Sequence, residues 1–369
     1  MAKNNARYNN VITDSFCFLF TKIRVSVIRI KVRLRVHLSV ITDNKIKDVL
    51  LSSKSAGTIK VGFLLVPNFS MIAFSAALEP LRVANRVAGD TIFEWVITSP
   101  TDEAVTASNG VRVDIEQTIT QLNDCHLVFI CSGINVKEYA KQNVFNITRR
   151  LDRQGAIVGA ICTGTYVLAS AGLLNDTRCT VHWENIDGLT EEFPYLEITN
   201  ELFEIHNNRI TCSGGTASLD MMLYLISQIH GQSLAAQVSD QFIHDRIRDP
   251  SDRQRMELRS RLGVSHPKLL TVVGMMEQHL EEPMSQTELA REASLSTRQL
   301  ERLFRKYLST TPTRYYLNLR LARARQLLRQ TSLSILSVAL ACGFVSASHF
   351  SKCYRETYGK TPRTERTPE

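Results

Sequence analysis

The sequence predicts an α/β domain with a parallel sheet covered by helices, followed by an all-helical domain. Three observations lead to this prediction. Short apolar runs alternate with helix-like stretches between residues 58 and 245, as a buried parallel sheet requires. Two similar helix-turn-helix patterns occupy residues 285–308 and 334–358 of the segment 268–366. The charge also changes sign between the two parts, and 369 residues suffice for two domains.

The charge change separates an acidic part from a basic one. Residues 58–245 carry 11 Lys and Arg against 21 Asp and Glu, whereas residues 266–369 carry 16 against 9. This asymmetry indicates a sensor or catalytic domain joined to a nucleic-acid-binding domain. A solvated basic surface is the alternative explanation of the charge alone. The Arg-rich polar segment 246–267 between the two parts is predicted to be a linker.

The first 57 residues are basic and fit neither domain. Residues 21–40 alternate basic and apolar side chains, but lack the continuous apolar core of a secretory signal. We expect residues 1–57 to be a disordered or non-native extension, with a membrane-surface role as the alternative. The chain has no apolar run long enough to span a membrane. Its eight cysteines show no metal-binding spacing, so we expect a reduced cytoplasmic protein without metal or cofactor.

The first domain is expected to contain four buried strands and a later hairpin. The strands are predicted at residues 59–66, 93–99, 126–133 and 156–161, and the hairpin at 204–215. A helix over residues 67–89 is expected to be interrupted before Pro80. A second helix, over residues 216–231, is apolar and serves either as core or as the face of a homodimer.

Three conspicuous groups fall where predicted strands end, which is where parallel sheets bind ligands. They are Cys131, Cys162 and the Ser-Gly-Gly turn at 213–215. Cys162 stands between a strand and a helix, where a helix dipole would favour the thiolate. Cysteine catalysis also needs a base, for which His182 and His206 are the candidates. The alternative for Cys162 is a small buried thiol at a tight turn, and the alternative for His182 is a structural histidine.

The stretch GAICTGTYVLASAGLL, residues 159–174, resembles the class I glutamine amidotransferase-like superfamily, which includes deglycases and intracellular proteases. The resemblance implies a flavodoxin-like sheet between helices, with Cys162 as the elbow nucleophile and Glu79 as an acid that meets the sulfur. Hydrolases of the protease branch have a histidine directly after this cysteine, where this chain has Thr163. We therefore expect no enzyme activity. The alternative is a bifunctional protein that retains Cys-dependent hydrolase or amidase activity.

The helix-turn-helix pattern occurs twice at an offset of 50 residues. Ser285 and Ser296 are placed to cap the two helices of the first unit. An inward-facing stripe is expected at Leu300, Leu303, Phe304 and Tyr307. Ser346 repeats the position of Ser296, and a basic helix joins the two units.

These paired units resemble the AraC/XylS family of transcription regulators across the last hundred residues. The family places both recognition helices in successive major grooves on one face of the DNA. The resemblance implies base contacts from Arg298, Glu301 and Arg302 in the first unit, and from Ala347, Ser348, Ser351 and Lys352 in the second. Phosphate contacts or a solvated surface are expected for Arg305, Arg320, Arg323 and Arg325.

The combination of both domains resembles a subgroup of bacterial activators of quaternary-amine catabolism, which respond to glycine betaine, carnitine or related compounds. This implies a ligand-responsive activator whose partners are double-stranded DNA, a small-molecule effector and RNA polymerase. The candidate ligand pocket comprises Glu79, Cys162, Thr163, His182, Trp183 and Gly214. A quaternary ammonium prefers aromatic faces, which Phe69, Phe74, Trp95, Tyr166 and Trp183 offer unless they belong to the core.

Overall fold

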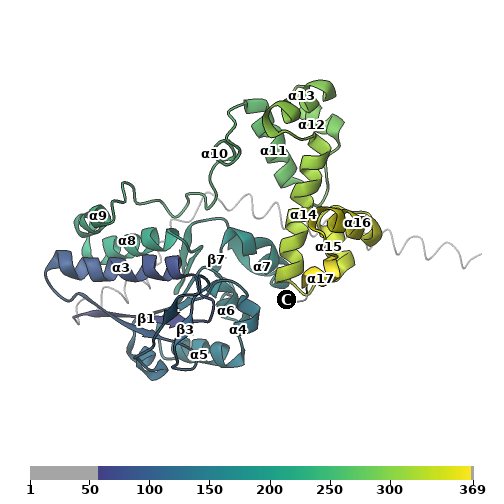
Figure 1. The fold of residues 1–369 in the computed structure, drawn as a ribbon. Coiled ribbons are helices and arrows are strands. Elements are labelled where there is room, and N and C mark those ends of the chain that lie inside the picture. Colours follow the sequence, from purple (N-terminus) through teal and green to yellow (C-terminus); the bar gives the residue numbers. More distant parts are fainter. Residues whose placement is uncertain (1–56, 367–369) are drawn as a thin grey trace, which may run out of the picture. The chain divides into compact units, whose positions relative to one another are not determined.

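The computed structural model describes residues 57–366 (Figure 1), so the predicted extension lies outside the described residues except for Gly57. The α/β domain is built on a six-stranded sheet in the order β2-β1-β5-β6-β10-β9, in which the β9–β10 pair alone is antiparallel. Its strands are β1 (Ile59–Leu65), β2 (Phe93–Thr98), β5 (Leu127–Cys131), β6 (Ile157–Ile161), β9 (Phe203–His206) and β10 (Arg209–Cys212). The predicted parallel sheet and late hairpin are confirmed.

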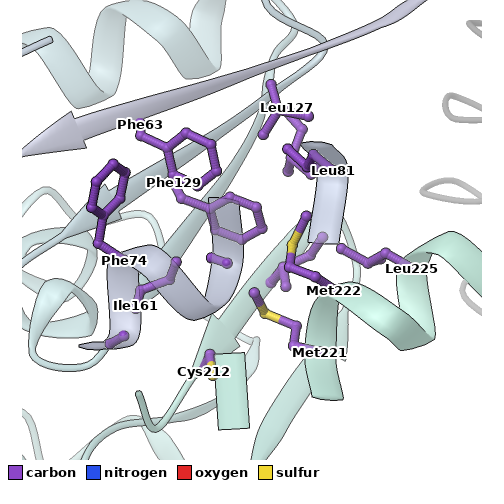
Figure 2. Close-up of a cluster of buried hydrophobic side chains, with 14 of the residues drawn as sticks. Phe63, Phe74, Leu81, Leu127, Phe129, Ile161, Cys212, Met221, Met222 and Leu225 are labelled. Atoms are coloured by element: carbon purple, nitrogen blue, oxygen red, sulfur yellow. The ribbon is translucent and has the colours of Figure 1, made fainter. Parts of the chain in front are cut away.

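Helices cover both faces of this sheet. One face packs against α3 (Met71–Ala88), α8 (Ala217–His230) and α9 (Gln232–Gln241), and the other against α5 (Gln142–Arg153), α6 (Gly164–Ser170) and α7 (Ile186–Glu192). Successive side chains of β1 point to opposite faces of the sheet. Phe63 packs in the apolar cluster on the first face, and Leu64 packs in the cluster on the second. Figure 2 shows the first cluster, where Phe63 and Phe129 stack with ring centroids 6.0 Å apart.

Shorter elements complete the α/β domain. They are β3 (Val105–Thr106), β4 (Arg112–Val113), η1 (Ile119–Asp124), α4 (Val136–Tyr139), β7 (Arg178–Thr180), η2 (Trp183–Asn185) and β8 (Glu197–Thr199). The strands β3 and β4 form an antiparallel ribbon, and β7 and β8 form a parallel pair. No described helix is long and apolar enough to cross a bilayer.

The predicted interruption of the first helix is wrong, because α3 continues through Pro80 to Ala88. Proline lacks the N–H that would bond to the carbonyl four residues earlier. Burial compensates for this loss, since Ala77 and Leu81, on either side of Pro80, are fully buried. The helix ends at Gly89, whose φ of 71° suits a left-handed C-cap.

The helical domain has two apolar cores joined by one long helix. Its elements are α10 (Leu258–Leu262), α11 (Pro267–Gln278), α12 (Gln286–Glu292), α13 (Thr297–Leu308), α14 (Pro312–Gln330), α15 (Ile335–Ala341), α16 (Ala347–Tyr358) and α17 (Pro362–Arg366). Helix α14 supplies Tyr316 to the first core and Leu327 to the second. The all-helical fold class with two helix-turn-helix units is confirmed.

The segment between the domains differs from the expected linker of residues 246–267. Pro250 accepts a hydrogen bond from the Leu202 amide at 2.8 Å, and Arg253 forms a β-bridge with Glu201. The Gln254 amide donates to the carbonyl oxygens of Val181 and Glu201. Farther along the chain, Arg261 pairs with Glu277 of α11 at 2.9 Å. We therefore propose that the linker begins after Gln254.

Candidate functional site

The carboxyl ends of three neighbouring strands bring cysteine and glycine residues together at one edge of the sheet. Cys131 of β5 and Cys212 of β10 are both in register with Ile161 of β6, directly before Cys162. The Cys162 amide donates to the Cys212 carbonyl at 2.9 Å. The prediction that these three groups stand at strand ends is therefore confirmed, and the three strands end at the same edge of the sheet.

Cys162 has the strained backbone of a strand-to-helix elbow. Its φ is +59°, a left-handed value that is uncommon outside glycine. Two glycines make room for this turn. A Cβ on Gly164 would lie 2.1 Å from the Ile130 oxygen, and a Cβ on Gly214 would lie 2.7 Å from the Cys162 Cβ. The glycine at each position is thus required by a close approach.

Thr163 has a structural use in this elbow. Its side chain is buried, and its hydroxyl donates to the Gly133 carbonyl at 2.6 Å. This hydrogen bond ties the start of α6 to the loop after β5. The position that carries a histidine in the resembling hydrolases therefore anchors the elbow in this chain.

The Cys162 thiol is buried. Burial raises its pKa to about 12, against the smaller opposing effect of the Thr163 amide, and the charges of Cys212 and Glu184 raise the pKa further. The Thr163 amide at the start of α6 lowers the pKa of the thiol, but burial outweighs this effect. Stabilisation of the thiolate by the helix dipole stays a prediction.

The two candidate bases do not hydrogen-bond to this sulfur. Burial lowers the pKa of His182, although nearby Glu184 partly opposes the shift. The His182 Nδ1 atom lies 3.8 Å from Glu184 Oε2, and the imidazole packs beside Trp183. His206 accepts a hydrogen bond from the Arg178 amide. Within residues 57–366, no group of His, Cys, Asp and Glu gathers closely enough to hold a metal ion.

Serine caps start both recognition helices of the helical domain. The Ser296 hydroxyl accepts from the Gln299 amide, and the Ser346 hydroxyl accepts from the His349 amide. Ser285 caps α12 in the same way, with Glu288 completing a capping box. Each cap satisfies an amide that the first turn leaves without a helical partner.

The outward faces of α13 and α16 present polar side chains to solvent. Arg298, Arg302 and Arg305 are exposed on α13, while Leu300 and Phe304 are buried beneath them. On α16, Ser348 and Lys352 are exposed, and Ala347 and Ser351 are half-buried. This arrangement leaves a row of hydrogen-bond donors on each helix, as direct base recognition requires.

Comparisons with known proteins bear on both domains. Residues 289–367 match the helix-turn-helix domain family, and residues 60–228 match the DJ-1/PfpI family. The chain is 46% identical over 306 residues to the HTH-type transcriptional regulator GbdR of Pseudomonas aeruginosa, covering 83% of each chain. It is 48% identical to the HTH-type transcriptional regulator CdhR of the same species, over 82% of this chain and 90% of CdhR.

A third relative is the HTH-type transcriptional regulator GlxA of Rhizobium meliloti, 39% identical over 84% of this chain and 96% of GlxA. The chain belongs to this family of HTH-type transcriptional regulators. It is a DNA-binding transcription regulator, and both predicted domain resemblances are confirmed.

Glu79 requires a correction. The elbow resemblance implied that its carboxylate meets the Cys162 sulfur. The structure instead pairs Glu79 with Arg82 on the surface of α3, at 2.6 Å. The charge of another carboxylate, that of Glu184, contributes a small part of the raised pKa of the Cys162 thiol. Sequence reasoning missed Glu184, although it stands two residues after His182 in the stretch VHWEN.

The aromatic candidates do not gather in one cage. Phe69 and Phe74 are core residues with ring centroids 5.6 Å apart, and Trp95 packs against the same core. Tyr166 donates to Glu192 on the other face of the sheet. Trp183 packs beside His182 and stands directly before Glu184, whose charge contributes to the raised pKa of Cys162.

Several predicted surface positions of the helical domain have internal contacts. Arg320 donates to the carbonyl oxygens of Cys342 and Gly343, and Arg325 pairs with buried Glu365 at 3.1 Å. Their assignment as phosphate contacts or solvated surface is therefore corrected. Glu301 accepts from Gln286, and Tyr307, expected to face inward, is 37% exposed.

Arg355 was missed as a candidate DNA contact. It is exposed on α16, one turn after Lys352. The signal was present in the sequence, because Arg355 stands 50 residues after Arg305. Each recognition helix therefore carries at least two exposed cationic side chains, which are Lys352 and Arg355 on α16.

Other residues line a hollow on the surface of the α/β domain. Its lining comes from the ends of β1 and β2 and from the α4–α5 region, and includes Pro67, Ser99, Glu103, Tyr139 and Lys141. None of the six candidate pocket residues lines it. The structure brings Cys162, Thr163 and Gly214 together at the elbow, and His182 packs against Trp183.

Proposed function

We propose that the elbow of the α/β domain binds a small quaternary amine, such as glycine betaine or carnitine, and thereby controls operator binding by the helical domain. The protein acts as a transcription activator that recruits RNA polymerase at genes for amine catabolism, and it catalyses no reaction. The observation that carries this proposal is the elbow itself. It keeps the strained geometry and the glycines of an amidotransferase-like site, but burial raises the pKa of its thiol to about 12.

The proposed ligand fits the chemistry of the elbow residues. A quaternary ammonium has no hydrogen-bond donor, so an aromatic face such as that of Trp183 suits it. The Glu184 carboxylate adds a negative charge on the neighbouring residue. A ligand carboxylate would accept hydrogen bonds from the backbone amides of the elbow or of the Ser-Gly-Gly turn.

A thermal-shift screen of the full chain against glycine betaine, carnitine, choline, dimethylglycine and basic amino acids tests this ligand class. A ligand at about a hundredfold excess over its dissociation constant stabilises the folded state by about 2.7 kcal/mol. We expect glycine betaine or carnitine to raise the melting temperature, and the basic amino acids to leave it unchanged. No shift with any amine would refute the quaternary-amine assignment.

The competing function is a Cys-dependent hydrolase or amidase that also binds DNA. We expect Cys162→Ser to retain amine binding and effector-dependent activation, because the thiol at pH 7 is a neutral group of similar shape to a hydroxyl. Activation is measured with a promoter reporter, and hydrolysis with amide and ester substrates. A turnover in the parent protein that Cys162→Ser abolishes would establish the catalytic function instead.

Arg302 tests the DNA contact of the first recognition helix. We expect Arg302→Ala to weaken operator binding by about 1–3 kcal/mol and to relax specificity at one base pair. The matched control is Arg82→Ala, which removes an exposed arginine from α3 of the α/β domain. Binding is measured by fluorescence anisotropy at fixed salt concentration. If Arg302→Ala and Arg82→Ala bind the operator with equal affinity and equal base specificity, the assignment of Arg302 as a base contact is contradicted.

A further inference from the structure

The aromatic face of Trp183, which we propose to hold the effector, is already covered by a cation from the chain itself. The Arg255 guanidinium lies over the Trp183 ring, with its carbon 4.4 Å from the ring centroid. Arg255 itself is exposed, and no ion pair fixes it among the interactions of the described residues. A cation–π contact at an exposed position is weak and is readily exchanged for another cation.

Hydrogen bonds hold the residues before Arg255 to the α/β domain. Asp220 is fully buried and accepts from the Arg248 amide at 2.8 Å and from the Arg248 guanidinium at 2.6 and 2.9 Å. Arg248 also donates to Thr216, which follows the Ser-Gly-Gly turn. We call residues 248–255 the strap, because hydrogen bonds of Arg248, Pro250 and Gln254 fix it to the α/β domain.

The strap bonds to Leu202 and Val181, which connect it to the Ser-Gly-Gly turn and to the segment before His182. On one side, Ser213 donates to the Leu202 carbonyl, and the Leu202 amide donates to Pro250. On the other side, Gln254 donates to the Val181 carbonyl, directly before His182. Arg255 is therefore delivered to Trp183 by a fixed anchor one residue earlier, and it is also the first residue of the chain that leaves the α/β domain.

We propose that Arg255 is a tethered competitor of the effector, so that an amine cation that takes the Trp183 face displaces Arg255 and releases the end of the strap. This inference rests on the proposed ligand class. Arg255 and a quaternary ammonium are both cations that bind an aromatic face. Since Arg255 precedes the helical domain in the chain, its release changes the restraint on that domain. Occupancy of the elbow is thereby coupled to DNA binding.

The test compares Arg255→Ala with Arg253→Ala in the full-length protein. Both variants remove an exposed arginine of the strap, but Arg253 does not cover Trp183. The probe is tetramethylammonium chloride, followed by tryptophan fluorescence against sodium chloride at equal ionic strength. We expect Arg255→Ala to bind the probe about two- to fivefold more tightly than the parent. Its promoter reporter output without amine should also rise.

Two further variants strengthen the comparison. Arg255→Lys keeps a cation and should stay close to the parent in both measurements, whereas Trp183→Leu should lose probe binding while retaining a cooperative unfolding transition. The parent protein could bind no amine while Arg255→Ala binds tetramethylammonium. This result would refute the quaternary-amine effector and would still support competition by Arg255 for the Trp183 face. Arg255→Ala values equal to those of Arg253→Ala, in probe affinity and in basal output, would overturn the inference.

Discussion

Replacing Asp220 by alanine should lower the stability of the α/β domain by about 3 kcal/mol. Its carboxylate is completely buried and accepts hydrogen bonds from Arg248, and it lies 2.9 Å from the His244 ring. Removing it leaves the Arg248 amide without its acceptor and leaves the guanidinium with its bond to Thr216, which costs more than the lost attraction alone. Urea denaturation followed by tryptophan fluorescence measures the change. The signal is specific, because both tryptophans, Trp95 and Trp183, belong to the α/β domain.

Asp240→Ala is the matched control for this substitution. Asp240 lies in the last turn of α9 and is exposed. Its replacement should change the unfolding free energy by no more than about 0.5 kcal/mol. Equal unfolding midpoints for Asp220→Ala and Asp240→Ala would show that the buried carboxylate does not hold the strap.

The second large effect is expected from Phe350→Ala in the helical domain. Phe350 is fully buried in α16, and its ring packs 5.1 Å from that of Phe344 and 5.6 Å from that of Tyr354. Truncating a buried phenylalanine to alanine costs about 3–5 kcal/mol. Because α15 and α16 share this small core, we expect faster amide exchange in both helices and loss of specific operator binding.

Phe350→Leu separates core packing from a direct role in recognition. Leucine fills most of the space, so its cost should stay below about 1.5 kcal/mol, with operator binding retained. Amide exchange by mass spectrometry and anisotropy with a fixed operator provide the two measurements. Normal operator affinity in Phe350→Ala would contradict the role of the second helix-turn-helix unit.

The sequence predicted the elements whose patterns are local. The buried strands follow from continuous apolar runs, and the two helix-turn-helix units follow from caps and apolar spacing repeated at an offset of 50. The elbow at Cys162 was predictable because an apolar strand is followed directly by Cys162, Thr163 and Gly164. In contrast, α3 continues past Pro80 because tertiary burial outweighs a local breaking signal.

The side-chain partners were less predictable, because they depend on the position of distant residues. Glu79 pairs with Arg82 three residues away rather than with Cys162, and Arg325 is neutralised by Glu365 from another helix. The strap was read as linker because its Arg-rich sequence is polar. Its order comes from Asp220, a carboxylate 28 residues before Arg248 that becomes buried only in the folded domain.

Selection of operators from random duplex DNA by the full-length protein tests the central claim most directly. With two recognition helices in successive major grooves, the selected sequences should contain two conserved half-sites about 10 base pairs apart, centre to centre. Their enrichment should change when glycine betaine is present at a concentration that shifts the melting temperature. A single half-site, or enrichment that no amine of the screen alters, would contradict a regulator that reads DNA through both units under control of the elbow.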